Sequence, residues 1–171
     1  MSPSESTAVP EPTASSATGL LLFDGHCNLC NTTVSMMLDY DKFFAPNDEP
    51  RIKFAPLQSD EARKALMSVH LKPEDYCNPD NPQEETVVFF TPEMQVHIRS
   101  TAILRALAFL SPAWLAWLFI ALLHIFPLGF RDTVYKQVAK NRLRLFGKSS
   151  TCRMPTKAER RHFLVSSKKA G

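Results

Sequence analysis

Apolar and polar positions follow distinct patterns along the first two thirds of the chain, and these patterns predict strands and helices in turn. Short apolar or alternating runs bounded by turn residues predict strands at 20–23, 51–55, 86–90 and 95–99. Apolar residues at spacings of three and four predict helices that begin near Asn28, after Ser59 and after Ser100. We expect both serines to cap their helices, and the third helix to end near Leu110.

The order of these elements predicts the fold class. Two strands joined by a helix are expected to be parallel, with a right-handed crossover, and the hairpin formed by the last two strands adds antiparallel partners. We therefore predict an α/β fold, a mixed four-stranded sheet with flanking helices over residues 20–110. This is the layout of thioredoxin.

The last third of the chain has a different pattern, which predicts a helical extension over residues 111–171. Ser111 followed by Pro112 predicts a helix start, with the proline at the first helical position. The next 14 residues, 113–126, are almost wholly apolar, but a membrane span needs roughly 20. We predict a buried helix here; contact with a membrane surface is the less favoured alternative.

Two further helices are expected beyond this apolar segment. Residues 132–146 predict an amphipathic basic helix that ends at Gly147. Its expected apolar positions are Val134, Tyr135, Val138 and Leu145. Thr156 with Glu159 predicts a capping box for a last short helix that carries Phe163 and Leu164.

Charge is distributed unevenly along the chain. Residues 131–171 hold 12 Lys/Arg against 2 acids, and the remainder holds 8 against 15. We interpret the basic end as a solvated helical face and expect no nucleic acid partner, because no nucleic-acid-binding module accompanies it. Residues 1–19 contain no Lys or Arg and no apolar run, so we expect a disordered tail rather than a targeting signal.

The four cysteines suggest one reactive pair and two separate thiols. Cys27 and Cys30 are two residues apart, whereas Cys77 and Cys152 stand alone. This pattern differs from a disulfide scaffold and favours a reducing compartment, so we expect a cytoplasmic protein.

The Cys27-Asn28-Leu29-Cys30 segment carries the candidate chemistry. A thiol at the N-terminus of a helix meets free backbone N–H groups and the positive end of the helix dipole, which lower its pKa. We expect Cys27 to be the nucleophile of thiol–disulfide exchange and Cys30 the resolving thiol. Asp24, three residues earlier, is either a turn or cap carboxylate or a proton acceptor for the thiols.

Two alternatives to catalysis stay open at this point. A zinc site usually needs four Cys or His ligands, commonly in paired motifs, and only one pair is present. The pair could also be structural or redox-sensing in a module that binds a partner or a membrane surface. We expect no metal and no cofactor; the expected partners are a protein or small-molecule thiol or disulfide and an unidentified reductant or oxidant.

The segment Asp24-Gly25-His26-Cys27-Asn28-Leu29-Cys30-Asn31 resembles the signature of the DCC family of thiol–disulfide oxidoreductases. The similarity continues through residues 54–59, 99–100, 131–135, 141–142 and 152–155, and so covers about 20–164. The resemblance implies a thioredoxin-like fold, disulfide oxidoreductase activity, and Asp24, Cys27 and Cys30 as site residues. Thioredoxins have a proline directly before the third strand, whereas in this chain Glu85 and Thr86 precede Val87.

Overall fold

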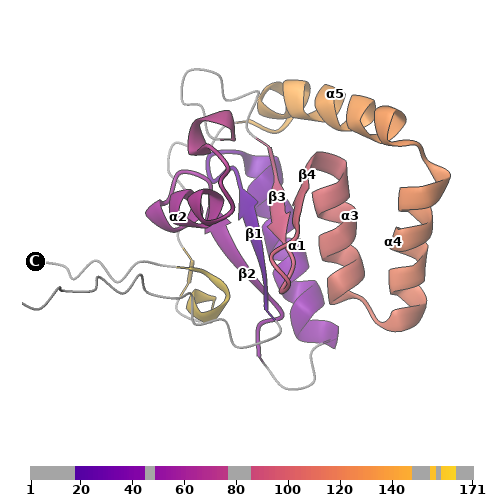
Figure 1. Ribbon diagram of the computed structural model, residues 1–171, viewed down its shortest axis with the longest axis horizontal. Coiled ribbons are helices and arrows are strands. Elements are labelled where there is room, and N and C mark those ends of the chain that lie inside the picture. The colour runs from indigo at the N-terminus through magenta and orange to yellow at the C-terminus, as the bar shows by residue number, and fades with distance from the viewer. Residues whose placement is uncertain (1–17, 45–48, 77–85, 148–154, 157–158, 165–171) are drawn as a thin grey trace, which may run out of the picture.

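The computed structural model describes residues 18–44, 49–76, 86–147, 155–156 and 159–164 (Figure 1). The strands are β1 (Gly19–Phe23), β2 (Ile52–Pro56), β3 (Val88–Phe90) and β4 (Val96–Ile98). The α-helices are α1 (Asn28–Phe44), α2 (Asp60–Ser68), α3 (Arg99–Leu110), α4 (Ala113–Ile125) and α5 (Leu128–Phe146), and the 3₁₀ turns are η1 (Pro73–Asp75) and η2 (Arg160–His162).

The four strands form one mixed sheet in the order β2-β1-β3-β4. β1 is parallel to β2, to which α1 connects it, and β3 is antiparallel to both β1 and β4. The predicted α/β fold with a mixed four-stranded sheet is therefore confirmed, and it is consistent with a thioredoxin-like protein.

Helices cover both faces of the sheet. On one face, α1 and α3 pack their apolar sides against strand residues such as Phe23, Phe54 and Phe89. On the other face, α2 packs through Ala62 and Leu66. Because β1 lies in the middle of the sheet and is buried on both faces, its carboxyl end is held firmly where the Asp24 turn leads into α1.

The capping predictions have mixed outcomes. Ser59 caps α2 as expected, since its side chain accepts the N–H of Ala62 at 3.2 Å. The prediction for Ser100 is wrong, because α3 begins at Arg99, two residues earlier than expected, and the Ser100 hydroxyl donates to Asp132 of α5 instead. Ser111 is not the N-cap of α4 either; it follows the end of α3 and donates to the carbonyl of Leu107.

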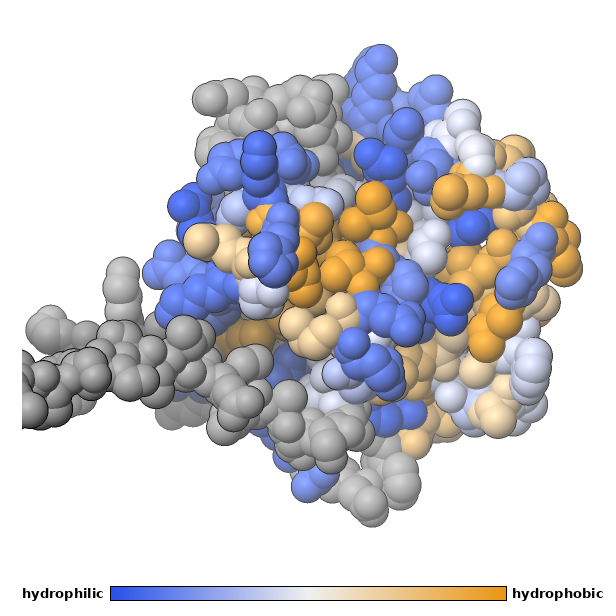
Figure 2. Space-filling view, in the orientation of Figure 1, coloured by the Kyte–Doolittle hydropathy of each residue, from blue (hydrophilic) through white to orange (hydrophobic). Residues whose placement is uncertain are grey.

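The prediction that residues 113–126 form a buried helix is also wrong. The helix is present as α4, but it has no buried residue. α4 packs against α3 and forms the outer edge of the described part of the chain, as Figure 1 shows, so its other side faces solvent. Apolar atoms gather along this edge in the space-filling view (Figure 2).

Within the described residues, no single helix is long and apolar enough to cross a membrane. α4 and residues 128–142 of α5 would suffice together by length and composition, but they are bent by 101°. Contact with a membrane surface therefore stays a prediction.

α5 begins at Leu128, four residues earlier than expected, and ends before Gly147 as predicted. Gly147 adopts φ +78°, a conformation that favours glycine. Three of its four predicted apolar positions, Val134, Val138 and Leu145, are exposed. The side of α5 that faces the protein carries Ala139 and Arg142 instead. Arg142, which was not among the predicted inward-facing positions, is thus buried.

The C-terminal capping pair forms, but the helix that it was expected to start does not. Glu159 accepts the N–H and the hydroxyl of Thr156 at 3.0 Å each. Among the residues that the structure describes here, only the 3₁₀ turn η2 follows, and Phe163 leaves it to form a parallel bridge with Phe54 of β2. Phe163 therefore lies at the edge of the sheet.

The exposure of α4 predicts the fluorescence of the protein. The chain's two tryptophans, Trp114 and Trp117, both lie on α4 and are 73% and 70% exposed. We expect their emission in dilute solution to resemble that of the unfolded chain and to be quenched by acrylamide almost as strongly. A blue-shifted emission that resists the quencher would show that α4 is covered and would contradict this arrangement.

Candidate redox site

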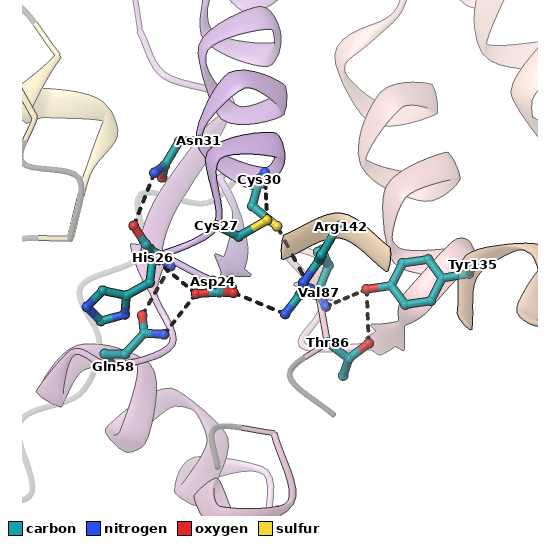
Figure 3. Close-up of polar contacts among 11 residues, drawn as sticks. Asp24, His26, Cys27, Cys30, Asn31, Gln58, Thr86, Val87, Tyr135 and Arg142 are labelled. Carbon is teal, nitrogen blue, oxygen red and sulfur yellow. Dashed lines mark hydrogen bonds and ion pairs between the residues drawn. The ribbon is translucent and has the colours of Figure 1, made fainter. Parts of the chain in front are cut away.

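The two cysteines of the predicted motif meet at the N-terminus of α1. They approach each other to 3.2 Å. Cys27 immediately precedes the helix, and its sulfur accepts the backbone N–H of Cys30 at 3.4 Å, as a capping side chain does (Figure 3). The helix start therefore supplies a hydrogen bond that favours a negatively charged Cys27 sulfur.

Asp24 joins the cysteine turn to a distant helix. One of its carboxylate oxygens accepts the N–H of His26 at 2.9 Å and the side-chain amide of Gln58 at 3.2 Å. The other oxygen accepts the guanidinium of Arg142, on α5, at 3.0 Å. Asp24 is 2% and Arg142 3% exposed, so this ion pair is buried. Asp24 is therefore both a turn residue and the anchor of a buried cation.

Arg142 also reaches the cysteine pair. A second nitrogen of its guanidinium lies 4.0 Å from the sulfur of Cys30, and Figure 3 shows the guanidinium in contact with both the Asp24 carboxylate and this sulfur. Since a guanidinium stays charged at any pH the protein tolerates, it is a permanent positive charge beside the thiols.

The two thiols differ in pKa because their surroundings differ. The hydrogen bond from the Cys30 side chain is the largest influence that lowers the pKa of Cys27, and the Cys30 N–H and Arg142 act in the same direction. Burial and the charge of Asp24 oppose them, and the net result is a Cys27 pKa of about 6. The pKa of Cys30 is raised, because this thiol donates to Cys27 and is itself buried.

The two cysteines also differ in their exposure to solvent. Cys27 is fully covered, with an exposed fraction of 0%, whereas Cys30 is half-buried. Cys30 lines a cavity of about 240 Å³ whose lining does not include Cys27. The other lining residues are mainly apolar and come from α1, α3, α5, β1 and the approach to β3, with Arg142 as the charged exception.

Tyr135 of α5 closes the site on the side of β3. Its hydroxyl accepts the N–H of Val87 at 3.1 Å and the hydroxyl of Thr86 at 3.2 Å (Figure 3). Burial raises the pKa of Tyr135, so the phenol stays neutral. The backbone donor directly before β3 is therefore already satisfied within the chain.

The structure brings together all three predicted site residues, Asp24, Cys27 and Cys30. Sequence reasoning included residues 131–135 and 141–142 in the family resemblance, but it did not name Arg142 as a site residue or predict the contact of Tyr135 with β3. A signal was present, since Tyr135, Ala139 and Arg142 lie at spacings of four and three and thus share one helix face. Because the surrounding sequence is rich in Lys and Arg, we interpreted this helix as a solvated basic face.

The remaining cysteines, Cys77 and Cys152, lie outside the described residues. Within the described part, no group of three or more His, Cys, Asp or Glu side chains is arranged to hold a metal ion. The described residues therefore provide no geometric support for the zinc alternative.

A thioredoxin-like fold with a Cys-x-x-Cys pair at the start of the first helix is typical of proteins with reactive thiols. Residues 21–148 match the model of the DCC1-like thiol-disulfide oxidoreductase family, and the chain belongs to this family.

Two relatives are similar over most of the chain. The uncharacterized protein YuxK of Bacillus subtilis is 33% identical over 146 residues, which cover 85% of this chain and 93% of YuxK. The chloroplastic DCC family protein At1g52590 of Arabidopsis thaliana is 30% identical over 135 residues, which cover 79% of this chain and 69% of that protein. No solved structure gives a significant match.

The lowered pKa of Cys27 predicts the pH at which its thiolate forms. The ultraviolet absorbance of the thiolate, taken as the difference from a Cys27→Ser variant, should rise with a midpoint at about pH 6, whereas an ordinary cysteine titrates with a midpoint at about pH 8.5. Replacing Cys30 by Ala removes the largest stabilising hydrogen bond and should move this midpoint upward. A midpoint near 8.5 in the unsubstituted protein would contradict the described site.

The buried Asp24–Arg142 pair predicts a strong effect on stability. Arg142→Met leaves a buried carboxylate without its cation and should lower the free energy of unfolding by roughly 3–5 kcal/mol. The double variant Asp24→Asn with Arg142→Met should cost less than the sum of the two single variants, measured by urea unfolding. Strictly additive effects would show that the two charges do not interact.

Proposed function

We propose that this protein is a thiol–disulfide oxidoreductase in which Cys27 and Cys30 alternate between a dithiol and a disulfide. One observation carries this proposal: the two cysteines lie 3.2 Å apart at a helix N-terminus that stabilises a thiolate on Cys27. Membership of a family with this activity in its name supports it.

The proposed reaction transfers two electrons between this pair and a substrate. In the reducing direction, a thiolate of the pair attacks a substrate disulfide and one substrate sulfur leaves as a thiol. The other cysteine then attacks the mixed disulfide, which releases the second substrate thiol and closes the Cys27–Cys30 disulfide. In the oxidising direction the same steps run in reverse, and the partner that resets the pair is a second thiol or disulfide.

Arg142 and Asp24 have distinct proposed roles. Arg142 offsets the negative charge that resides on the sulfurs whenever the disulfide is open. Asp24 holds the guanidinium in place, although its own charge raises the pKa of Cys27. We therefore propose Asp24 as a positioning residue whose removal changes the thiol pKa as well as stability.

The fit of extended polypeptide substrates differs from that in thioredoxins. No cis peptide bond occurs in the described residues, and Tyr135 occupies the N–H of Val87 beside the cysteines. A substrate strand would have to displace the tyrosine to pair there. This geometry favours a narrower substrate range than general protein disulfide reduction, and a reducing compartment such as the cytoplasm remains the proposed location.

A second candidate function is a non-catalytic module that binds a partner or a membrane surface and uses the cysteine pair structurally or as a sensor. The exposure of α4, with Trp114 and Trp117 on its surface, is the observation that favours it. Redox behaviour of the cysteine pair separates catalysis from a purely structural pair, and turnover of a disulfide substrate separates catalysis from a sensor.

The redox equilibrium of the pair tests the proposed function. Wild-type protein is equilibrated in a series of glutathione buffers, free thiols are trapped with an alkylating agent, and the products are read by mass spectrometry. We expect a reversible two-electron transition between Cys27 and Cys30, absent in the matched variants Cys27→Ser and Cys30→Ser. If no disulfide forms between these residues at any poise, the oxidoreductase proposal fails and the non-catalytic module is favoured.

A further inference from the structure

The outer side of α4 and the bend that leads into α5 form an exposed apolar surface, which we call the α4–α5 surface. Six of its large apolar residues are more than half exposed: Trp114, Trp117, Leu118, Ile125, Leu128 and Phe130. Those on α4 follow one another at helical spacing and therefore lie on one side of the helix. A continuous apolar surface of this size is typical of an interaction site rather than of a solvent-facing helix.

The helices around this surface carry an excess of positive charge. Residues 99–147 contain seven Lys or Arg and a single acid, Asp132. This acid is already engaged within the chain, since its carboxylate lies 3.6 Å from the guanidinium of Arg99 and accepts the hydroxyl of Ser100 at 2.7 Å. The charge around the α4–α5 surface is therefore complementary to a negatively charged partner.

α5 carries its exposed cations and its exposed apolar residues in separate rows. Lys136, Lys140 and Arg144 are exposed and follow at intervals of four residues, so they form a row along the helix. Val134 and Val138, which are 49% and 46% exposed, form a second row with the same spacing. Helices that lie in the surface of a bilayer combine such rows, with apolar residues at the hydrocarbon boundary and cations among the headgroups.

The composition of α4 favours a lipid surface over a protein partner. Apart from the N–H groups of Trp114 and Trp117, His124 is the one side chain of α4 that can form a hydrogen bond. A protein interface surrounds its apolar centre with a polar rim, whereas hydrocarbon needs no such partners. Tryptophan is also enriched where a membrane meets water, because its ring is apolar and its N–H is polar.

A second copy of this chain is a poorer occupant of the same surface. A symmetric dimer brings identical surfaces together, so the cation rows of both copies would lie close to each other. Like charges that face each other oppose association. An anionic bilayer instead offers hydrocarbon to α4 and negative charge to α5.

We infer that the α4–α5 surface docks this protein on an anionic membrane, with the outer side of α4 at the hydrocarbon boundary and the cations of α5 at the headgroups. α4 has 13 residues and is about 20 Å long, shorter than the ~30 Å hydrocarbon core. The 101° bend also keeps α4 and α5 from forming one straight span. The helices therefore lie in the membrane surface, and this docking is independent of the chemistry of the cysteine pair.

Vesicle flotation of the full-length protein tests the inference. The vesicles consist either of phosphatidylcholine alone or of an equal mixture of phosphatidylcholine and phosphatidylglycerol. We expect the protein to float with the anionic vesicles, to bind less at high salt, and to show blue-shifted tryptophan emission that resists acrylamide once bound. Absence of flotation with the anionic vesicles, or bound protein with unshifted emission, would overturn the inference.

A first pair of variants tests the apolar part of the surface. Leu118→Gln with Ile125→Gln keeps both tryptophans and should lower binding to anionic vesicles by about tenfold or more. The matched control is Phe43→Gln with Met67→Gln, which alters residues 81% and 61% exposed on α1 and α2 and should leave binding unchanged. Trp117→Gln replaces the first variant if that variant does not fold by circular dichroism. Equal binding of the folded α4 variant and the wild type would overturn the inference.

A second pair of variants tests the cation row. Lys136→Glu with Lys140→Glu should lower binding to anionic vesicles by about tenfold or more, because each cation near such a surface contributes to attraction. Arg63→Glu with Lys64→Glu on α2 changes the net charge equally, also at exposed positions, and should have little effect. Equal loss of binding in both variants would show attraction by net charge alone and would overturn the inference.

Sedimentation of the protein without vesicles tests the competing occupant. A concentration-dependent dimer that is lost in the Leu118→Gln with Ile125→Gln variant, together with absence of vesicle binding, would assign the surface to a second copy and overturn the inference. None of these measurements uses the cysteine pair. Failure of membrane docking would therefore leave the proposed thiol–disulfide function intact, and failure of the redox transition would leave the docking intact.

Discussion

The buried ion pair between Asp24 and Arg142 is the constraint on which the rest of this site depends. It joins the end of the central strand to a helix 118 residues later in the chain. Two charges removed from water are tolerated only when each has a well-placed partner, so the pair fixes the position of α5 over the start of α1. Without this ion pair, the guanidinium would not be held beside the two cysteines.

The same ion pair contributes to the electrostatic balance of the thiols. The hydrogen bonds from Cys30 favour the Cys27 thiolate most strongly. Asp24 raises the pKa of Cys27, and Arg142 compensates both negative groups. The site thus stabilises a thiolate on the fully covered Cys27 and leaves Cys30 at the cavity.

Much of this arrangement could be predicted from sequence because it depends on local patterns. The strands, α1 and α2 follow the periodicity of apolar residues. The position of Cys27 and Cys30 at a helix start follows from the same periodicity, which begins near Asn28. The burial of α4 could not be predicted, because an apolar segment does not reveal whether another layer covers it. Arg142 was concealed for a related reason: its partner Asp24 is far away in sequence, and only the tertiary fold turns a surface-like charge into a buried one.

α5 supplies contacts to the site at three successive levels along its length. Tyr135 seals the approach to β3, Arg142 faces the sulfurs, and the carbonyl of Phe146 accepts the side chain of Asn28, inside the Cys-x-x-Cys loop, at 3.0 Å. The sheet and the cysteine motif, which lie in the first 110 residues, consequently make up an incomplete site. A shortened chain that ends after α3 would retain the layout of a thioredoxin but lose its fixed cation, one wall of its cavity and the clamp on its reactive turn.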